Sequence, residues 1–507
     1  MNNVKKVLYN NVYYEVDTSI VTVKISDIKK IPFKIIRFNK LGYIDVELPA
    51  NISFDSAMHV IETDNNISKV IYSVKGEYNI ISPNDNLYYS QWGLRAINVL
   101  RAWSISTGKS SVIVGVIDSG VDWMHPDLGM GNDGYHNFHT NLMDQWGQFG
   151  DPSSGNNIDD DNNGLIDDYL GWNYENNSND CRSSYFHGTF VSGIISAKTN
   201  NNLGIAGIAG GNYSNGVKIL PYCVGENNPI SSVIDDAIID AVDKGAKIIQ
   251  LSLSVPQSVD IDDAIQYAYS NNAIVICAAG NNQPVVQYPA SNPQVVAVGA
   301  IDSNLVRAYF SCYDDDNVDI VAPGVSIQST DLNSTYTFSD GTSFAAPHIS
   351  GVAALIYSVN PNLNGQQVRE IIETTAQKLN GYIFQPASSD HPNGTWNNEV
   401  GYGLVDAYAA VVEACLYGNQ ITGDTNVQTC QISSFYYEGY LPDSFQIYWQ
   451  ITPNCAIYSG QNTTHVEIIP NSGNTAILTA SIILNGDTVK TYTKFLHITN
   501  YNTNIVI

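Results

Sequence analysis

Hydrophobic and polar residues follow three different patterns along the 507-residue chain. In residues 1–83, segments such as VTVKISDI and YIDVELP alternate apolar and polar positions, and SFDSAMHVIETDN has apolar residues at helical spacing. A period of two predicts strands with one buried face, whereas spacings of three and four predict an amphipathic helix. This part of the sequence therefore predicts a small α+β domain that ends at the turn signal Pro83-Asn84-Asp85-Asn86.

Residues 84–415 have a second pattern, in which almost continuous apolar runs alternate with amphipathic ones. The apolar runs are VIVGVID, VKILPY, AKIIQLSLS, AIVICAAG, QVVAVGAI and VDIVAPG, and the amphipathic runs include SSVIDDAIIDAVDKG and DIDDAIQYAYSNN. Strands without polar alternation are typical of a parallel sheet that helices cover on both faces. We therefore expect an α/β domain with a doubly wound, mostly parallel sheet.

Residues 416–507 return to strand-like alternation. The segments FQIYWQI, HVEIIP, AILTASIIL and VKTYTKFLHI are separated by turns such as Asn485-Gly486-Asp487. Short strands joined by turns, without helical runs between them, predict an all-β sandwich of the immunoglobulin-like (Ig-like) type.

Charge and composition narrow the possible partners. The chain has 49 acidic and 23 basic side chains and a formal net charge of −26, although residues 1–80 hold ten basic and nine acidic groups. We expect no nucleic-acid binding, because that needs clustered Lys and Arg, and no membrane span, because no apolar run of about 18 residues stands out. The low charged fraction of 14% and the 32 tyrosines favour a secreted or cell-surface protein, whose signal peptide would be missing from this sequence.

The seven cysteines lie far apart and form no Cys-x-x-Cys pair, which excludes metal-ligand spacing and a dense disulfide framework. Cys223 and Cys277 fall inside apolar strand-like runs and are expected to be buried thiols. For Cys430 and Cys455, a local bridge and two free thiols remain equally open.

Three polar residues follow or precede apolar elements in the central region. Asp118 ends the run VIVGVID, His187 opens a helical run, and Ser343 precedes another. Each alone has a structural explanation, as a turn cap, a hydrogen-bonding helix entry or an N-cap. Together they predict nucleophilic catalysis by a serine. A serine needs an imidazole to take its proton, and that imidazole needs a buried carboxylate to orient it. The carboxyl edge of a parallel sheet is also where such folds bind ligands.

The segments around these residues carry a family resemblance. They read VIDSGVDWMHPDL, HGTFVSGIISA and DGTSFAAPHISGVAALI, with LSLS at 251–254 and AAGNN at 278–282. The order Asp, His, Ser is that of subtilisin, and the serine segment is not the Gly-x-Ser-x-Gly of α/β-hydrolases. Residues 85–415 thus resemble the subtilisin-like serine proteases (subtilases).

The resemblance implies an endopeptidase that cleaves protein or peptide substrates through an acyl-enzyme. Asp118 would orient His187, His187 would act as general base, and Ser343 would be the nucleophile. Asn281 matches the family's oxyanion-hole asparagine and would act with the Ser343 N–H, although it could also be a simple turn residue. A catalytically silent binding protein and an esterase remain as alternatives.

Substrate would pair as an extended strand beside residues 251–254 and the segment after Tyr222. The residues expected to contact it are Ser252, Leu253, Ser254, Gly280 and Gln287. Here the sequence departs from the family, which typically has Ser-Leu-Gly-Gly where this chain has Ser252-Leu253-Ser254-Val255, and glycine where it has Gln287. The larger side chains predict a shallow, polar S1 pocket that disfavours large aromatic P1 residues.

The acidic segment NNIDDDNNGLIDDYLGWNY predicts a structural calcium ion. Asp159, Asp161, Asn163 and Gly164 fit the first half of a calcium loop, whose twelfth position here is not Glu. Asp167 and Asp168 would complete the oxygen ligands. The alternative is a solvated acidic loop.

Subtilases are commonly made with an N-terminal prodomain, and residues 1–83 have a suitable size and pattern. Their nearly balanced charge complements the acidic remainder, so this domain would act as an intramolecular inhibitor. The alternative is a permanent accessory domain. The domain at 416–507 would bind carbohydrate or another surface, or act as a spacer.

Overall fold

A computed structural model of the protein defines which parts of the chain can be described. These are residues 4–9, 12–25, 34–38, 43–48, 53–63, 67–74, 82–128, 130–131, 134–282, 284–439, 441–442, 444–452, 454–471 and 473–499. The chain divides into two compact units, Met1–Ile81 and Ser82–Ile507.

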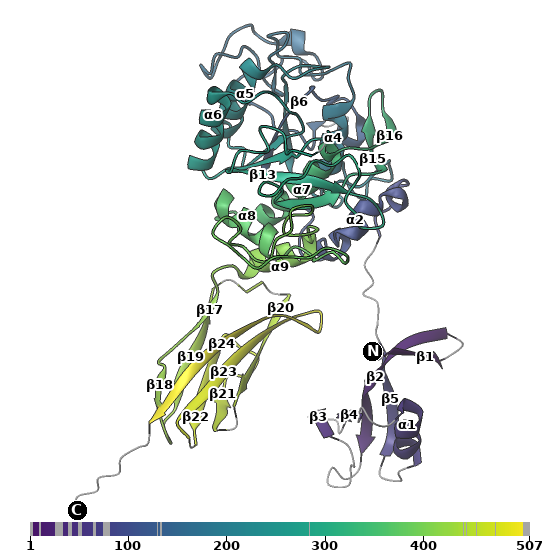
Figure 1. The fold of residues 1–507 in the computed structure, drawn as a ribbon, viewed down its shortest axis with the longest axis vertical. Coiled ribbons are helices and arrows are strands. Elements are labelled where there is room, and N and C mark those ends of the chain that lie inside the picture. Colours follow the sequence, from purple (N-terminus) through teal and green to yellow (C-terminus); the bar gives the residue numbers. More distant parts are fainter. Residues whose placement is uncertain are drawn as a thin grey trace, which may run out of the picture. The chain divides into compact units, whose positions relative to one another are not determined.

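The N-terminal unit is an antiparallel sheet with one helix (Figure 1). Its elements are β1 (Val4–Tyr9), β2 (Val12–Ile25), β3 (Lys34–Phe38), β4 (Tyr43–Glu47), α1 (Phe54–Thr63) and β5 (Ile67–Val74). The strand order is β1-β2-β4-β3, and β5 also pairs with β2. Alternate residues of β2 and β4, such as Val21, Val23 and Ile44, are buried with Met58 and Ile61 of α1. The predicted α+β fold is confirmed.

The central part of the chain contains a seven-stranded sheet in which every pair is parallel. Its strands are β6 (Ile113–Asp118), β9 (Trp172–Asn173), β10 (Lys218–Cys223), β11 (Ile248–Leu251), β12 (Ile274–Ala278), β13 (Val295–Ile301) and β14 (Ile320–Pro323). The order is β14-β13-β12-β11-β6-β10-β9. Strand β6 therefore lies at the switch point, where successive strands begin to be added on the opposite side, and open α/β sheets bind ligands beyond the carboxyl ends of the strands there.

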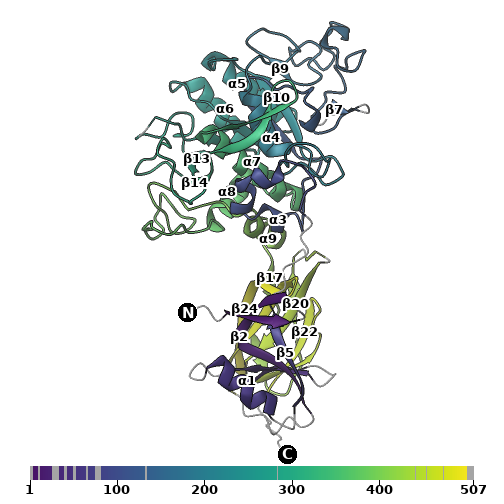
Figure 2. The same cartoon turned by 90° about the vertical axis from the view of Figure 1, so that its right-hand side faces the viewer.

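Helices cover both faces of this sheet, as predicted. Helices α4 (His187–Ser196) and α7 (Thr342–Val359) lie side by side on one face, and α5 (Ile234–Asp243) and α6 (Val259–Ser270) lie together on the other (Figure 2). The remaining elements of the domain are α2 (Trp92–Ala96), α3 (Val99–Ala102), the hairpin of β15 (Ile327–Asp331) and β16 (Thr335–Ser339), α8 (Gly365–Thr374), α9 (Ala407–Leu416), the short pair β7 (Met130–Gly131) and β8 (Gly134–Tyr135), and single turns of 3-10 helix at Tyr88–Ser90, Pro126–Leu128, Pro152–Ser154 and Ser231–Val233.

Helix α7 is an exception to the expectation that no apolar run of about 18 residues is present. Its 18 residues reach a mean hydropathy of 1.2, which is long and apolar enough to cross a membrane by length and composition. However, 89% of the helix is buried inside the protein, where it packs on α4 and the sheet. The apolar character of α7 is therefore explained by its place in the core of the α/β domain.

The C-terminal part forms two four-stranded sheets. One has the order β17-β19-β22-β21 and the other β18-β24-β23-β20. The strands are β17 (Gln420–Thr422), β18 (Asn426–Gln428), β19 (Ser433–Glu438), β20 (Phe445–Ile451), β21 (Cys455–Ser459), β22 (His465–Pro470), β23 (Thr475–Leu484) and β24 (Asp487–Thr499). Side chains of both sheets, including Phe435, Trp449 and Ile482, form one buried cluster. This confirms the predicted sandwich and places Trp449 in its core.

Helix α9 belongs to two hydrophobic cores. Val411 and Ala414 pack in the core of the α/β domain, whereas Val412, Cys415 and Leu416 belong to the cluster of the sandwich. Polar contacts reinforce this junction, because Lys490 pairs with Glu413 at 2.5 Å and the Tyr492 hydroxyl donates to the carbonyl of Leu416. The boundary predicted at 415/416 thus falls within a helix that both parts share.

All seven cysteines are free, and six of them are buried. The Cys430 N–H donates to the carbonyl of Pro470 in β22, and Cys455 pairs with the same Pro470 from the other side. Two segments on opposite sides of the same strand are about 9–10 Å apart. This distance exceeds the largest Cα separation that a disulfide spans, about 7 Å. The bridge considered between these two cysteines does not form.

Candidate active site

The carboxyl end of β6 carries a hydrogen-bonded pair at the switch point. Asp118 is the last residue of β6 and is only 5% exposed, and His187 is the first residue of α4. The His187 Nδ1 lies 2.7 Å from the Asp118 Oδ1, which also accepts the Ser119 N–H. A carboxylate only accepts, so the proton of this bond is on Nδ1 and the Nε2 of the neutral ring is left as the base.

Two opposing effects act on the pKa of His187. Burial of the ring favours the neutral form, but the charge of Asp118 and its hydrogen bond outweigh burial, so the pKa lies above the usual value. Asp118 therefore stabilises the protonated imidazole, the form that a general base reaches when it accepts a proton.

Ser343 stands in the first turn of α7, after Gly341, the N-cap. Its Oγ donates to the carbonyl of Ser252 at 3.3 Å. The ring of the next residue, Phe344, lies 5.4 Å from the His187 ring between centroids, so the helix start and the histidine are neighbours. The Ser343 N–H is one of the four N–H groups at a helix N-terminus that have no partner within the helix.

Asn281 lies beside the same helix start. Its Oδ1 accepts both the N–H and the hydroxyl of Thr342, at 2.9 and 3.0 Å. Because the oxygen is held in this way, the Nδ2 of the amide remains available for another acceptor. The structure therefore brings Asn281 within one residue of Ser343, although the two are 62 positions apart in the sequence.

The residues predicted to contact substrate have two different environments. Ser252 is buried, and its Oγ donates to the Ser343 carbonyl at 2.7 Å, so its side chain supports the start of α7. Ser254 and Gln287 line an open cleft of about 620 Å³. Its other lining residues are Val255, Pro256, Gln257, Asn282, Pro284, Val285, Val286 and Tyr288. Leu253, between Ser252 and Ser254, is half-buried.

Gln287 also contacts Gly280. A Cβ at Gly280, whose φ is +106°, would lie 2.4 Å from the Oε1 of Gln287. The glutamine side chain thus lies directly over the glycine and occupies space next to the cleft.

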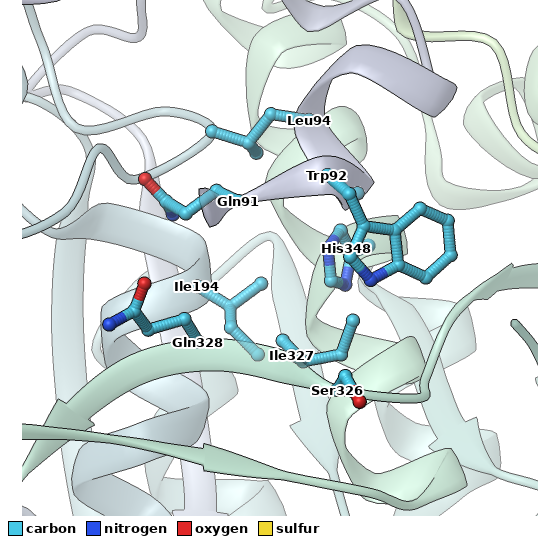
Figure 3. Close-up of a pocket in the computed structure, with 9 residues that line it drawn as sticks. Gln91, Trp92, Leu94, Ile194, Ser326, Ile327, Gln328 and His348 are labelled. Carbon is cyan, nitrogen blue, oxygen red and sulfur yellow. The ribbon is translucent and has the colours of Figure 1, made fainter. Parts of the chain in front are cut away.

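His348, in α7, is one of the residues that line a small cavity (Figure 3). The cavity, of about 10 Å³, has room for roughly one water molecule, which is too little for a substrate group. The His348 Nδ1 lies 2.8 Å from the Phe344 carbonyl, and burial lowers the pKa of this ring to about 4. His348 therefore stays neutral and serves the packing of α7.

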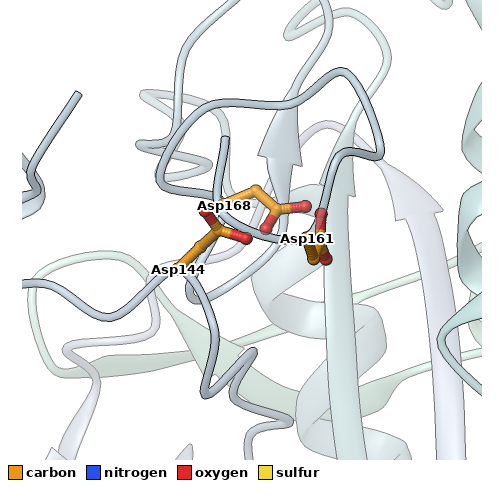
Figure 4. A group of neighbouring side chains, drawn as sticks. All are labelled: Asp144, Asp161 and Asp168. Carbon is orange, nitrogen blue, oxygen red and sulfur yellow. The ribbon is translucent and has the colours of Figure 1, made fainter. Parts of the chain in front are cut away.

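Three carboxylates of the acidic segment converge (Figure 4). Oxygen atoms of Asp144, Asp161 and Asp168 lie within 4.8 Å of one another, and Asp144 and Asp168 are buried. The Nδ2 of Asn141 lies 3.0, 2.9 and 2.6 Å from Asp144, Asp161 and Asp168, respectively. An amide nitrogen has two protons for these three acceptors.

The other predicted metal ligands are not part of this trio. Asp159 accepts the N–H groups of Asn163 and Gly164, and Asp167 accepts those of Asn156 and Asn157. Both carboxylates thus hold the turns of the segment, while the Asn163 Nδ2 donates to Asp168 at 2.9 Å. Asp144 lies outside the acidic segment that predicted the calcium ion, and its place in the trio depends on the fold.

The sequence motifs also did not indicate a pair of buried carboxylates, Asp85 and Asp127. Asp85 accepts the N–H groups of Asn200 and Asn201, and Asp127 accepts those of Ile205 and the Asn201 side chain. Burial, with further help from Asp85, raises the pKa of Asp127 to about 7, although its hydrogen bonds act in the opposite direction. These carboxylates hold the loop that follows α4.

Comparisons with known proteins identify the class of enzyme. A family model described as the subtilase family matches residues 109–403. A thermophilic serine proteinase of Bacillus sp. (strain AK1) is 34% identical over 333 residues, which cover 65% of this chain and 69% of the relative. Thermitase of Thermoactinomyces vulgaris is 32% identical over 303 residues, which cover 59% of this chain and 93% of the relative. Together with the fold, these matches identify a serine endopeptidase.

The chain belongs to the subtilase family. This confirms the resemblance found in the sequence motifs. A halolysin of Haloferax mediterranei, 31% identical, aligns over 73% of this chain and 63% of its own length.

Proposed function

We propose that the protein hydrolyses peptide bonds through an acyl-enzyme formed on Ser343. The observation that carries this proposal is the hydrogen bond of 2.7 Å between His187 and the buried Asp118, next to the helix start that holds Ser343. His187 Nε2 would take the proton of the serine as its Oγ leaves the Ser252 carbonyl and attacks the scissile carbonyl carbon. The same ring would then protonate the leaving amine, and water would release the acyl group.

The negative oxygen of the tetrahedral intermediate needs donors that are already in place. Two groups are suitable. The Nδ2 of Asn281 is oriented by the bonds from Thr342 to its oxygen, and the Ser343 N–H is at the positive end of the dipole of α7.

A fluorophosphonate probe tests the proposal against a catalytically silent binding protein. We expect stoichiometric labelling at Ser343, and peptides released from a denatured proteome should show cleavage. A protein that is folded but unlabelled, and that releases no peptides, would contradict the proposal.

We also propose that Asp144, Asp161 and Asp168 hold a calcium ion with structural function. Oxygen-rich clusters are the sites that calcium prefers. The ammonium group bonded to this trio, that of Lys244, is shared between Asp168 and Asp240, so the three negative charges are not balanced. A divalent cation would remove the repulsion between them.

Removal of calcium should therefore lower the melting temperature by several degrees. An ion present at one hundred times its Kd stabilises the folded state by about 2.7 kcal/mol. We expect Asp161→Asn to abolish this response to a chelator, whereas Asp424→Asn, in an exposed turn of the sandwich, should keep it. No calcium uptake by isothermal titration, with an unchanged melting temperature in chelator, would contradict the site.

For substrate selection, we propose that Gln287 makes the S1 pocket shallow and polar. The contact of its side chain with Gly280 supports this proposal. Gln287→Gly should raise kcat/KM for peptides with Phe at P1, relative to Ala, by about tenfold. Gln431→Gly, in the sandwich, should leave this ratio unchanged. A preference of the unaltered protein for Phe or Leu at P1 would contradict the proposal.

The N-terminal unit would act as a prodomain that inhibits the enzyme until it is cleaved. Support comes from its separate compact fold with its own buried core. We further propose that the enzyme works outside the cell, where calcium is plentiful, and that the sandwich at 416–507 binds a surface or acts as a spacer.

A further inference from the structure

A glutamate stands close to the catalytic pair on the side of β10. Strand β10 ends at Cys223, which pairs with Asp118, and Glu226 follows three residues later. The Oε2 of Glu226 accepts the Ser184 hydroxyl at 2.6 Å, and its Oε1 accepts the Ser184 N–H at 3.3 Å. Ser184 precedes His187 by three residues. The carboxylate is thus held in a fixed orientation on the loop that leads into the histidine.

This loop lies directly beside the reacting histidine. The ring of Tyr185, next to Ser184, is parallel to that of His187, with 6.2 Å between the centroids. The Ser119 Oγ donates to the Tyr185 carbonyl and accepts the Gly188 N–H, which fixes the loop against the end of β6.

The charge of Glu226 has no basic partner among the residues that the structure describes. The arginine of this loop, Arg182, is engaged with Asp180 at 2.5 Å. The N–H of Glu226 donates to the carboxylate of Glu175 at 2.8 Å, which brings a second negative charge to the same place. Serine and backbone donors orient the Glu226 carboxylate but do not neutralise it.

An extended substrate would present alternate side chains to opposite sides. In the proposed function, the P1 side chain points toward Gly280 and Gln287. The P2 side chain, one residue earlier, would then point the other way, toward the loop that holds Glu226, because β10 lies on the opposite side of β6 from β11 and β12.

We propose that Glu226 selects substrates with lysine or arginine at P2. This inference rests on the proposed function, and it adds a residue that determines specificity. A long basic side chain passing beside His187 reaches the carboxylate with its charged end. Because Glu226 is partly exposed, solvent screens the pair, and we expect a preference of about fivefold in kcat/KM for Lys over Gln at P2.

The test uses the full chain and peptides with one fixed P1 residue that the protein cleaves, with Lys, Gln or Glu at P2. We expect kcat/KM to fall in that order, and the differences to shrink as the salt concentration rises. Glu226→Gln should make the three peptides nearly equal, and Glu226→Lys should reverse the order. Ser184→Ala, which frees the carboxylate, should weaken the preference without reversing it.

Glu467→Gln is a matched control, because Glu467 in the sandwich also accepts a serine hydroxyl at 2.6 Å, from Ser459. It should keep the order of the unaltered protein. Equal cleavage of the three peptides by the unaltered protein, or a preference that Glu226→Gln leaves intact, would overturn the inference while the proposed function stands. Failure to cleave any peptide, with no fluorophosphonate labelling of Ser343, would remove both.

Discussion

Ser343→Ala is expected to lower kcat for peptide hydrolysis by about 10⁶-fold, the scale known for loss of the nucleophile in the related enzyme subtilisin. In the proposed mechanism the Ser343 hydroxyl would form the bond to the substrate, and alanine offers no substitute. The protein should remain folded, because the change removes a single hydrogen bond of 3.3 Å, to Ser252. Kinetics with a fluorogenic peptide and a melting curve measure the two quantities separately.

The same variant tests the prodomain. If the N-terminal unit is cleaved by the active site, incubation of the unaltered protein should give a new N-terminus between about residues 75 and 100. In Ser343→Ala the chain should stay intact. A cut that persists in the variant would contradict self-cleavage, and full hydrolytic activity of the variant would contradict the nucleophile itself.

Asp118→Asn is expected to lower kcat by about 10⁴-fold at neutral pH. An amide in place of the carboxylate can donate to Nδ1, which leaves the proton on Nε2, where it prevents the ring from acting as a base. The change also removes the charge that stabilises the imidazolium. Asp122→Asn is the matched control, because Asp122 accepts the Met124 N–H at 3.2 Å, a role that Asn can also fill, and it should keep nearly full activity.

The pH profile separates the charge effect from a loss of structure. Because Asp118 raises the pKa of His187, the acid limb of kcat/KM should lie above pH 6.5, and activity should fall as pH drops through that raised value. The contribution of the Asp118–His187 pair to the stability of the fold changes with pH in the opposite direction to the activity. It is fully present below the pKa of His187 in the unfolded state and is lost as pH rises through the raised pKa.

In Asp118→Asn the burial of the ring would no longer be opposed by a negative charge. The acid limb of the remaining activity should therefore move to lower pH. An unchanged limb would show that another group titrates in the profile.

Much of the fold could be predicted from the sequence, because buried parallel strands have a distinctive composition. All six predicted strands of the central sheet are present, whereas β9 was missed, since a strand of two residues has no period to detect. The place of Asp118 could also be anticipated, because it depends on one strand end and on the rule for parallel sheets.

The finer arrangement of the site depends on contacts that no local pattern encodes. The bond from Ser343 to the Ser252 carbonyl and the bonds from Thr342 to Asn281 join positions that are distant along the chain. The same limit applies to the acidic trio, where Asp144 comes from an earlier loop. It also applies to Cys430 and Cys455. They are close in sequence, but β22 lies between them in the folded protein.

The helix shared by two cores makes the C-terminal sandwich more than an exchangeable module. If the chain were shortened just after α9, solvent would reach the side chains of Val412, Cys415 and Leu416. The apolar surface exposed in this way would promote aggregation. Grafting this sandwich onto another enzyme would likewise require the transplant of α9 as its base. We therefore expect the sandwich and the α/β domain to depend on each other for stability through α9.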